Sequence, residues 1–196
     1  MPENFFAKMA IGLTSLIILL SCSKELPPGQ FSARLDISEN GQSIVNGSIY
    51  VDGWKYRMDV SQESERISII ADQKSDHTWL LMPDKKMCTY LDTDDPENIM
   101  SDPFLGLRTL ESDNDSDLTG NGVVNGYECD QYSIFRDKKE LMTYWKATNL
   151  HFPIKIVEHS SSDIVTELSG IAEGDIDDGI FTIPEDYTIV ASRWRP

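Results

Sequence analysis

Along Trp54-Lys55-Tyr56-Arg57-Met58-Asp59-Val60-Ser61, apolar and polar side chains alternate strictly. Successive side chains of a β-strand point to opposite faces of a sheet, so this pattern predicts a strand with one buried and one solvated face. Residues 31–38 alternate in the same way. Asp52-Gly53, just before the quoted stretch, predicts a tight hairpin turn. This part of the chain therefore predicts a meander of antiparallel strands.

Similar short segments follow, and turn signals such as Pro83-Asp84-Lys85-Lys86 and Asn125-Gly126 separate them. The predicted strands lie at 31–38, 43–52, 54–61, 66–72, 77–82, 87–92, 123–124, 127–136, 142–147, 154–159, 164–170 and 187–191. Ten to twelve short strands with no long helices between them predict a mainly β fold, built as an antiparallel barrel or a strongly curved sheet.

One short helix is predicted between the strands, over Asp102–Leu110. Asp102 is a favourable N-cap, and Pro103 is well tolerated in a first helical turn. Three apolar residues then fall on one face: Phe104, Leu107 and Leu110. This face is either a lid over the open end of a barrel or the underside of a connector, and the sequence leaves both open.

The N-terminal segment predicts export. Residues 9–20 carry no charge, follow Lys8, and are too few for the roughly 20 residues of a membrane-spanning helix, but they suit a secretory signal. Leu19-Leu20-Ser21-Cys22 resembles a bacterial lipobox, and Ser23 after it implies transport onward to the outer membrane. We predict a lipoprotein signal peptide over 1–21, a tether over 22–30 lipidated at Cys22, and one periplasmic domain over 31–196.

The chain is strongly acidic, with 33 Asp and Glu against 17 Lys and Arg and a net charge of −16. This balance argues against nucleic acid, because phosphate contacts need Lys and Arg. It also argues against flat adhesion to an anionic membrane, so lipid at Cys22 would provide the membrane contact. Cys88 and Cys129 then form an even pair in an oxidising compartment, which predicts a disulfide. The alternative is two free, buried thiols that pack as small apolar residues.

Residue patterns typical of enzymes and metal sites are missing from the sequence. The three histidines have no partners at zinc-ligand spacing: His77, His151 and His159. Asp113-x-Asp115-x-Asp117 begins like a calcium loop, but Leu118 stands where an EF-hand needs glycine and Val124 where it needs glutamate. We therefore predict no enzymatic activity, no cofactor and no metal site.

Aromatic and aliphatic residues occupy alternating positions on several predicted strands. If the barrel is packed solid, these residues form its core; if the wall is too wide to fill, they line an apolar cavity. The candidate cavity residues are Trp54, Tyr56, Met58, Trp79, Leu81, Tyr144, Ile154 and Ile156.

Several short motifs resemble a bacterial domain of unknown function that is similar to the lipoprotein carrier LolA and the receptor LolB. These motifs lie at 126–132, 144–148, 152–155 and 179–187, and the first half adds 47–60, Trp79 and the turn at 82–86. The resemblance covers residues 31–190 and implies a half-open antiparallel β-barrel wrapped around helices, with an apolar cavity for acyl chains. Such carriers tend to have Arg-Pro where this chain has Asp52-Gly53. Lipidation at Cys22 is also more similar to the anchored receptor than to the soluble shuttle.

Two main hypotheses follow. In the first, an outer-membrane-anchored lipoprotein binds a lipid, an acyl chain or another apolar ligand in its half-barrel. In the second, the barrel is packed, and the protein binds another envelope protein through its acidic loops or a sheet edge. A lipid that co-purifies favours the first, and a retained envelope protein without lipid favours the second. A hydrolase with an undetected site is a third and weaker hypothesis.

Overall fold

The computed structural model describes residues 26–62, 65–91 and 102–190. The predicted signal peptide and Cys22 lie outside these residues. In this part of the chain, no helix is long and apolar enough to cross a membrane.

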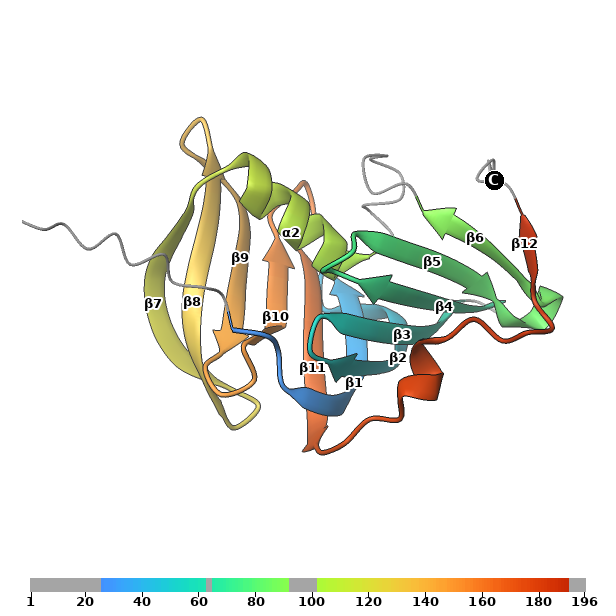
Figure 1. The fold of residues 1–196 in the computed structure, drawn as a ribbon. Coiled ribbons are helices and arrows are strands. Elements are labelled where there is room, and N and C mark those ends of the chain that lie inside the picture. Colours follow the sequence, from blue (N-terminus) through green and yellow to red (C-terminus); the bar gives the residue numbers. More distant parts are fainter. Residues whose placement is uncertain (1–25, 63–64, 92–101, 191–196) are drawn as a thin grey trace, which may run out of the picture.

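Twelve strands of the described residues form one open sheet (Figure 1). The sheet runs in the order β12-β6-β5-β4-β3-β2-β1-β11-β10-β9-β8-β7. The strands are β1 (Gln30–Glu39), β2 (Gln42–Asp52), β3 (Lys55–Gln62), β4 (Glu65–Asp72), β5 (His77–Met82), β6 (Met87–Leu91), β7 (Ser116–Val124), β8 (Tyr127–Arg136), β9 (Lys139–Ala147), β10 (Phe152–Glu158), β11 (Ile164–Glu173) and β12 (Thr188–Val190). The predicted mainly β fold, a half-open barrel with short inserted helices, is confirmed.

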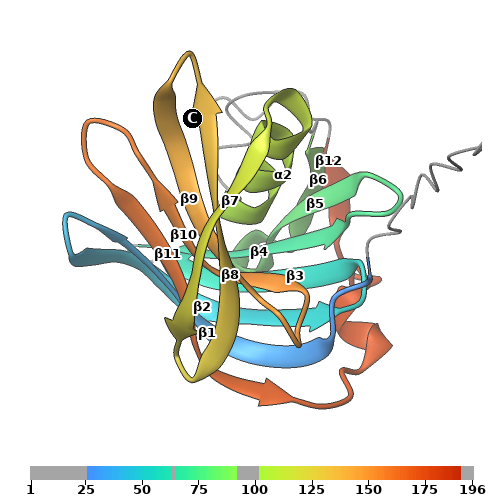
Figure 2. The ribbon, with the colours of Figure 1, turned by 90° about the vertical axis from the view of Figure 1, so that its left-hand side faces the viewer.

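The helix α2 (Pro103–Asp113) lies inside the curve of the sheet (Figure 2). The carboxylate of Asp102 accepts hydrogen bonds from the backbone N–H groups of Phe104 (3.0 Å) and Leu105 (3.2 Å). The predicted N-cap is therefore confirmed, and the helix continues to Asp113, beyond the predicted end at Leu110. Two short 3₁₀ helices, η1 (Pro83–Lys85) and η2 (Asp178–Phe181), complete the described structure.

Glycines set the turns and allow the close approach of strands. Asn125 and Gly126 both have positive φ, at 50° and 89°, as a tight hairpin between β7 and β8 requires. Gly47 allows β2 to approach β3, because a Cβ atom there would lie 2.1 Å from the backbone oxygen of Asp59. The predicted turn at 125–126 is confirmed.

The sheet is apolar on both faces over part of its area. On the inner face, a large cluster buries residues such as Ile49, Met58, Ile69, Ile154 and Leu168. On the outer face, a smaller cluster consists of Ile70, Leu81 and Cys88, covered by the C-terminal segment through Phe181, Ile183 and Tyr187. Since this segment crosses the outer face and ends in β12, it closes the back of β4, β5 and β6 (Figure 1).

Three expectations need correction. The predicted disulfide is wrong for this structure: Cys88 and Cys129 are free and buried, one in the outer cluster and one in the inner cluster. The strand β7 is much longer than the predicted 123–124, because Gly120, Gly122 and exposed polar residues hide its alternation. Finally, β12 pairs with β6 in parallel, whereas the other strand pairs are antiparallel.

Candidate functional site

Aromatic side chains fill the middle of the half-barrel. Phe31, Tyr56, Phe104 and Phe152 are each at most 3% exposed. The ring centroids of Phe104 and Phe152 lie 5.0 Å apart, and those of Tyr56 and Phe104 lie 5.6 Å apart. These contacts join α2 to β3 and β10. The inside of the half-barrel is thus packed at its centre, and the described residues line a pocket towards each end of the strands.

The first pocket, which we call the apolar pocket, has a volume of about 290 Å³. Aliphatic side chains from β1 to β5 form most of its wall, among them Leu35, Ile37, Met58, Val60, Ile69 and Leu80. Three further elements complete the lining among the described residues: β11 with Ile164 and Thr166, β10 with Glu158, and α2 with Pro103. Its volume is close to the lower end of the range of about 300–1,000 Å³ that is typical of ligand pockets.

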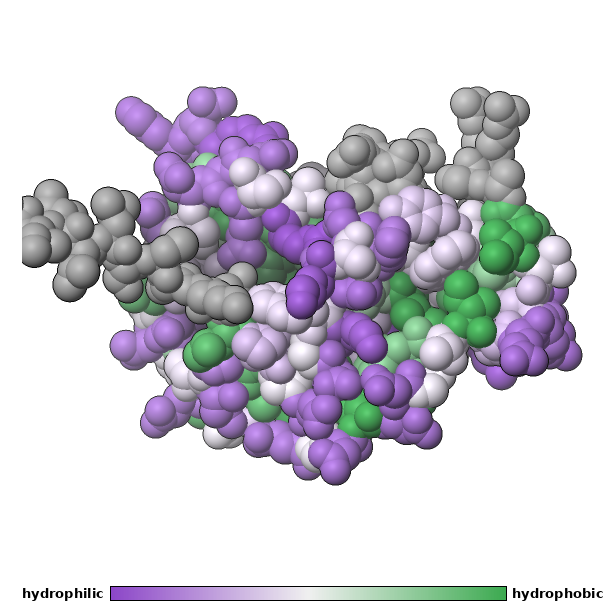
Figure 3. Space-filling model, in the orientation of Figure 1, coloured by the Kyte–Doolittle hydropathy of each residue, from purple (hydrophilic) through white to green (hydrophobic). Residues whose placement is uncertain are grey.

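The second pocket, the mixed pocket, has a volume of about 210 Å³. Trp54, Phe104 and Leu107 line it together with charged and polar residues, namely Arg108, Glu111, Tyr144, Lys146 and His151. Figure 3 shows this face of the molecule hollowed below α2, with hydrophobic residues at the bottom of the hollow and hydrophilic ones around it.

The two pockets lie at opposite ends of the strands. Trp54 lies in the turn between β2 and β3, and His151 in the turn between β9 and β10; both line the mixed pocket. Val60, Ile67 and Glu158 lie towards the other ends of their strands and line the apolar pocket. Successive turns of an antiparallel meander alternate between its two ends, which explains this separation.

A buried hydrogen bond holds α2 between the pockets. The Tyr56 hydroxyl donates to the carboxylate of Asp102 over 2.5 Å, and Asp102 is fully buried. Burial raises the pKa of Asp102, although the hydrogen bonds from Tyr56 and from the first turn of α2 oppose this shift. Burial, together with the negative charge of Asp102, also raises the pKa of Tyr56. The N-cap is therefore also the tertiary anchor of the helix.

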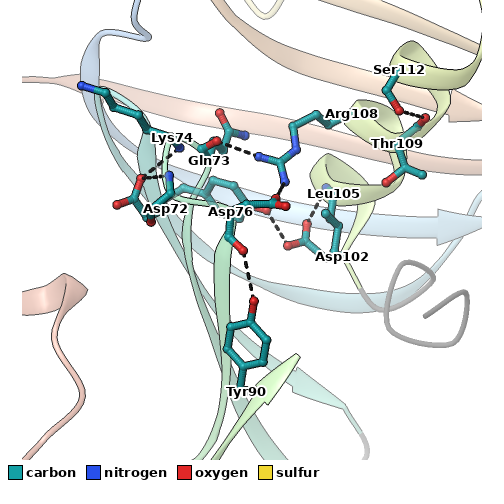
Figure 4. A network of polar contacts seen from close by, with 12 residues as sticks. Asp72, Gln73, Lys74, Asp76, Tyr90, Asp102, Leu105, Arg108, Thr109 and Ser112 are labelled. Carbon is teal, nitrogen blue, oxygen red and sulfur yellow. Dashed lines mark hydrogen bonds and ion pairs between the residues drawn. The ribbon is translucent and has the colours of Figure 1, made fainter. Parts of the chain in front are cut away.

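Arg108 forms a second anchor, on the mixed-pocket side of α2 (Figure 4). Its guanidinium donates to the backbone oxygen of Gln73 over 3.0 Å and pairs with the carboxylate of Asp76. The hydroxyl of Tyr90 donates to the backbone oxygen of Asp76 over 3.2 Å. Arg108 thus fixes the helix to the turn between β4 and β5.

Tyr144 connects the helix to the other half of the sheet. Its hydroxyl donates to the carboxylate of Glu111 and lies 3.1 Å from the hydroxyl of Ser116. Burial raises the pKa of Tyr144, and the adjacent Glu111 raises it further. Arg108, Glu111 and Tyr144, all at this end of the half-barrel, are therefore engaged in holding α2.

The structure divides the predicted cavity residues among four places. Met58 lines the apolar pocket, and Trp54 and Tyr144 line the mixed pocket. Tyr56, Ile154 and Ile156 are buried in the packed inner cluster and line neither pocket. The last two candidates, Trp79 and Leu81, were expected in the cavity but lie on the outer face of the sheet.

The placement of Trp79 and Leu81 has a physical reason. The strand β5 contains four consecutive large apolar residues, Trp79-Leu80-Leu81-Met82, because both faces of the sheet are covered there. Strict alternation is the signature of a strand buried on one face, so it cannot assign the faces of β5. Leu80, the residue between the two candidates, lines the apolar pocket.

The apolar face predicted for the helix packs against the sheet. Phe104 and Leu107 are buried and line the mixed pocket, and Leu110 is partly buried against the inner cluster. In the apolar pocket, α2 contributes Pro103. The helix therefore lies between the two pockets.

Sequence reasoning missed most of the apolar pocket. Leu35 and Ile37 could have been found, because they alternate with polar residues in the first predicted strand. Glu158 could have been found from the run Phe152, Ile154, Ile156, Glu158, in which it continues an inward-facing apolar row. In the residues that the structure describes, no group of three or more His, Cys, Asp or Glu is placed to hold a metal ion.

The sequence matches the family model of a domain of unknown function, DUF4412, over residues 33–151. The chain belongs to this family. The family match confirms the resemblance to a domain of unknown function that the sequence motifs indicated. No curated protein sequence matches the chain.

Several solved structures have a similar fold. An uncharacterized conserved protein from Thermus thermophilus matches 84% of this chain and 91% of its own, with 10% identity and a TM-score of 0.53. MucB matches with 14% identity and a TM-score of 0.52, over 86% of this chain but 62% of the MucB chain. A LolA superfamily protein from Nitrosomonas europaea matches 80% of this chain and 91% of its own, with 12% identity and a TM-score of 0.41. At these identities, the two similarities with TM-scores above 0.5 show the fold alone.

Proposed function

We propose that this DUF4412 protein is an envelope lipoprotein that binds a lipid, an acyl chain or another apolar ligand. The observation that supports the proposal is the apolar pocket, which keeps about 290 Å³ unfilled although aliphatic side chains of five neighbouring strands surround it. Apolar pockets with few polar groups are typical of sites for small apolar ligands. The proposed role is binding, not catalysis.

The lipid anchor belongs to the same proposal. Cys22 would carry the acyl chains, and residues 23–30 would hold the acidic half-barrel close to the outer membrane. The net charge of −16 supports anchoring by lipid, because an acidic surface gains nothing from anionic headgroups. Cys22→Ser should release the protein from the membrane fraction of its host. If the variant stayed in that fraction, anchoring at Cys22 would be wrong.

Native mass spectrometry of the protein from its own host tests ligand binding. We expect a co-purifying small molecule whose mass disappears after extraction with organic solvent, and uptake of decanol by the extracted protein. A bare mass before extraction, together with no uptake of decanol at any concentration below its solubility limit, would contradict the proposal.

A second candidate function is the binding of an extended segment of an envelope protein at β7. This strand ends the sheet of described strands and pairs with β8 alone. Its side chains Leu118 and Val123 are 63% and 71% exposed, which is unusual for large apolar residues at a sheet edge without a partner. Peptides bind such edges by adding a strand. Crosslinking from β7 to an envelope protein, in a preparation free of lipid, would favour this candidate over the first.

A further inference from the structure

Among the described residues, one ionisable side chain lines the apolar pocket, and it lies at the end of an apolar row. Phe152, Ile154, Ile156 and Glu158 occupy successive positions on the inner face of β10. The first three are at most 2% exposed and belong to the inner cluster. Glu158 continues the same row, so its side chain enters the lining of the pocket and not the solvated outer face. An inward-facing carboxyl group is unexpected in a wall whose described lining is mostly aliphatic.

The carboxyl group of Glu158 has no hydrogen-bond or ion-pair partner among the described residues, and its oxygens are not fully buried. Lys155 is on the outer face of β10, where it pairs with Glu167 over 3.3 Å. His159, the next residue in the chain, lies 2.9 Å from the hydroxyl of Thr143 and 3.3 Å from the carboxylate of Asp163. These two neighbouring basic side chains of the described residues are thus engaged elsewhere.

The surroundings of Glu158 disfavour its charged form. Burial raises the pKa of Glu158. The other polar residue in the lining is Thr166, which pairs with Ile156 on the adjacent strand. A partly buried carboxylate whose only partner is water gains stability when a bound molecule supplies a hydrogen-bond donor or a positive charge.

From this geometry we infer that the apolar pocket binds an alkyl chain whose polar head carries an ammonium group, with the ammonium ion paired to Glu158. The inference rests on the proposed function and specifies its ligand class. A fatty-acid anion would place a second carboxylate beside Glu158, and like charges at such a distance repel. The net charge of −16 adds to the preference for a cation. A neutral alcohol would fill the same volume without gaining the ion pair.

Three compounds with the same chain test the inference: decylammonium, decanol and decanoate. Their affinities for the full-length protein would be measured at pH 7 by calorimetry, below the micelle-forming concentrations of decylammonium and decanoate and below the solubility limit of decanol. We expect decylammonium to bind about tenfold more tightly than decanol, and decanoate to bind most weakly.

Glu158→Gln removes the negative charge and keeps the shape of the side chain. We expect it to lower the affinity for decylammonium about tenfold, to change that for decanol less than about threefold, and to raise that for decanoate. Glu128→Gln is the matched control, because it changes the net charge equally at an exposed position of β8. It should leave the three affinities in the same order.

The outcomes separate the inference from the proposed function. If none of the three compounds binds, the proposed function fails. If all three bind with affinities that Glu158→Gln and Glu128→Gln change equally, the apolar pocket stands but the role of Glu158 is wrong. If decanoate binds more tightly than decylammonium to the unmodified protein, the inference is likewise overturned.

Discussion

The two pockets lie at opposite ends of the same half-barrel, but the polar groups that line them differ in their bonding partners. In the mixed pocket, Arg108 and Tyr144 are bound to other residues of the chain and hold α2 in place. In the apolar pocket, Glu158 has no such partner among the described residues. Arg108 and Tyr144 therefore serve the fold, whereas burial disfavours the charged form of Glu158, and we infer that its carboxyl group is available to a ligand.

The packed centre explains why the two ends can differ. Tyr56, Phe104 and Phe152 fill the space between the pockets, so a change at one end need not reach the other. The half-barrel is therefore packed at its centre and hollow towards its two ends. Substitutions in the centre, at one end and at the other end should consequently have separable effects.

The largest effect is expected for Asp102→Ala, which releases α2 from both pockets. This substitution removes the N-cap of the helix and leaves the buried Tyr56 hydroxyl without its acceptor. Loss of a cap costs about 1–2 kcal/mol and an unsatisfied buried group about 1–3 kcal/mol, so we expect the free energy of unfolding to fall by about 2–4 kcal/mol. Chemical denaturation measures this change.

Asp113→Ala is the control for Asp102→Ala. Asp113 is exposed and lies in the last turn of the same helix, where a negative charge opposes the helix dipole. This variant should be as stable as the unmodified protein, or slightly more so. Equal losses in the two variants would show that Asp102 acts as an ordinary surface residue and does not anchor the helix.

The next effect is expected for Ile67→Trp, which fills the apolar pocket. Ile67 is half-buried and lines this pocket near the end of its strand. A tryptophan there would occupy volume that the ligand needs, and we expect the affinity for decanol to fall at least about tenfold, which corresponds to about 1.4 kcal/mol. Leu118→Trp, on the exposed strand β7, is the matched control and should bind decanol normally. Equal binding by both variants would place the ligand outside the apolar pocket.

A smaller effect is expected for Arg108→Met, which changes the mixed pocket alone. The methionine keeps an apolar side chain but loses the bonds to Gln73 and Asp76. Because Arg108 is partly exposed, we expect the free energy of unfolding to fall by about 1 kcal/mol. Decanol affinity should stay within about twofold, since the packed centre separates the pockets. A tenfold loss of decanol affinity would show that the two ends are coupled.

The sequence predicted the architecture better than the pockets. Strands such as β3 alternate strictly because one face is buried and the other wet, and Asp102 and Pro103 mark the start of the helix, so both were predicted correctly. The faces of β5 could not be predicted, because its outer face is covered by a segment about 100 residues later in the chain. Burial by a remote segment leaves no local signal.

The candidate site was predicted only in part for a similar reason. Alternation shows which residues face inward, but not which of them touch one another and which leave space. Ile156 and Met58 both face inward, yet Ile156 is packed in the core and Met58 lines a pocket. The difference depends on where the aromatic residues of α2 insert, and this is a property of the tertiary structure. The sequence shows Glu158 as a break in an apolar row, but it cannot show that the carboxyl group lacks a partner among the described residues.

The smallest expected effect is the dependence of stability on pH at Glu158. Burial raises the pKa of Glu158 above its unfolded value, so folding favours the protonated form. The contribution of Glu158 to folding stability is therefore complete below the unfolded pKa, near pH 4, and it is lost as the pH rises through the folded pKa.

The Glu158→Gln variant lacks this loss. At pH 7 it should be more stable than the unmodified protein by less than about 1 kcal/mol, because Glu158 keeps some solvent contact. At pH 4 the difference should vanish. Since no other residue in the described lining titrates, denaturation curves of the two proteins at pH 4 and pH 7 isolate this one group. A constant difference at both pH values would show that the carboxyl group is fully solvated, and the polar group of the apolar pocket would then have no more need of a ligand than the bonded Arg108 and Tyr144 of the mixed pocket.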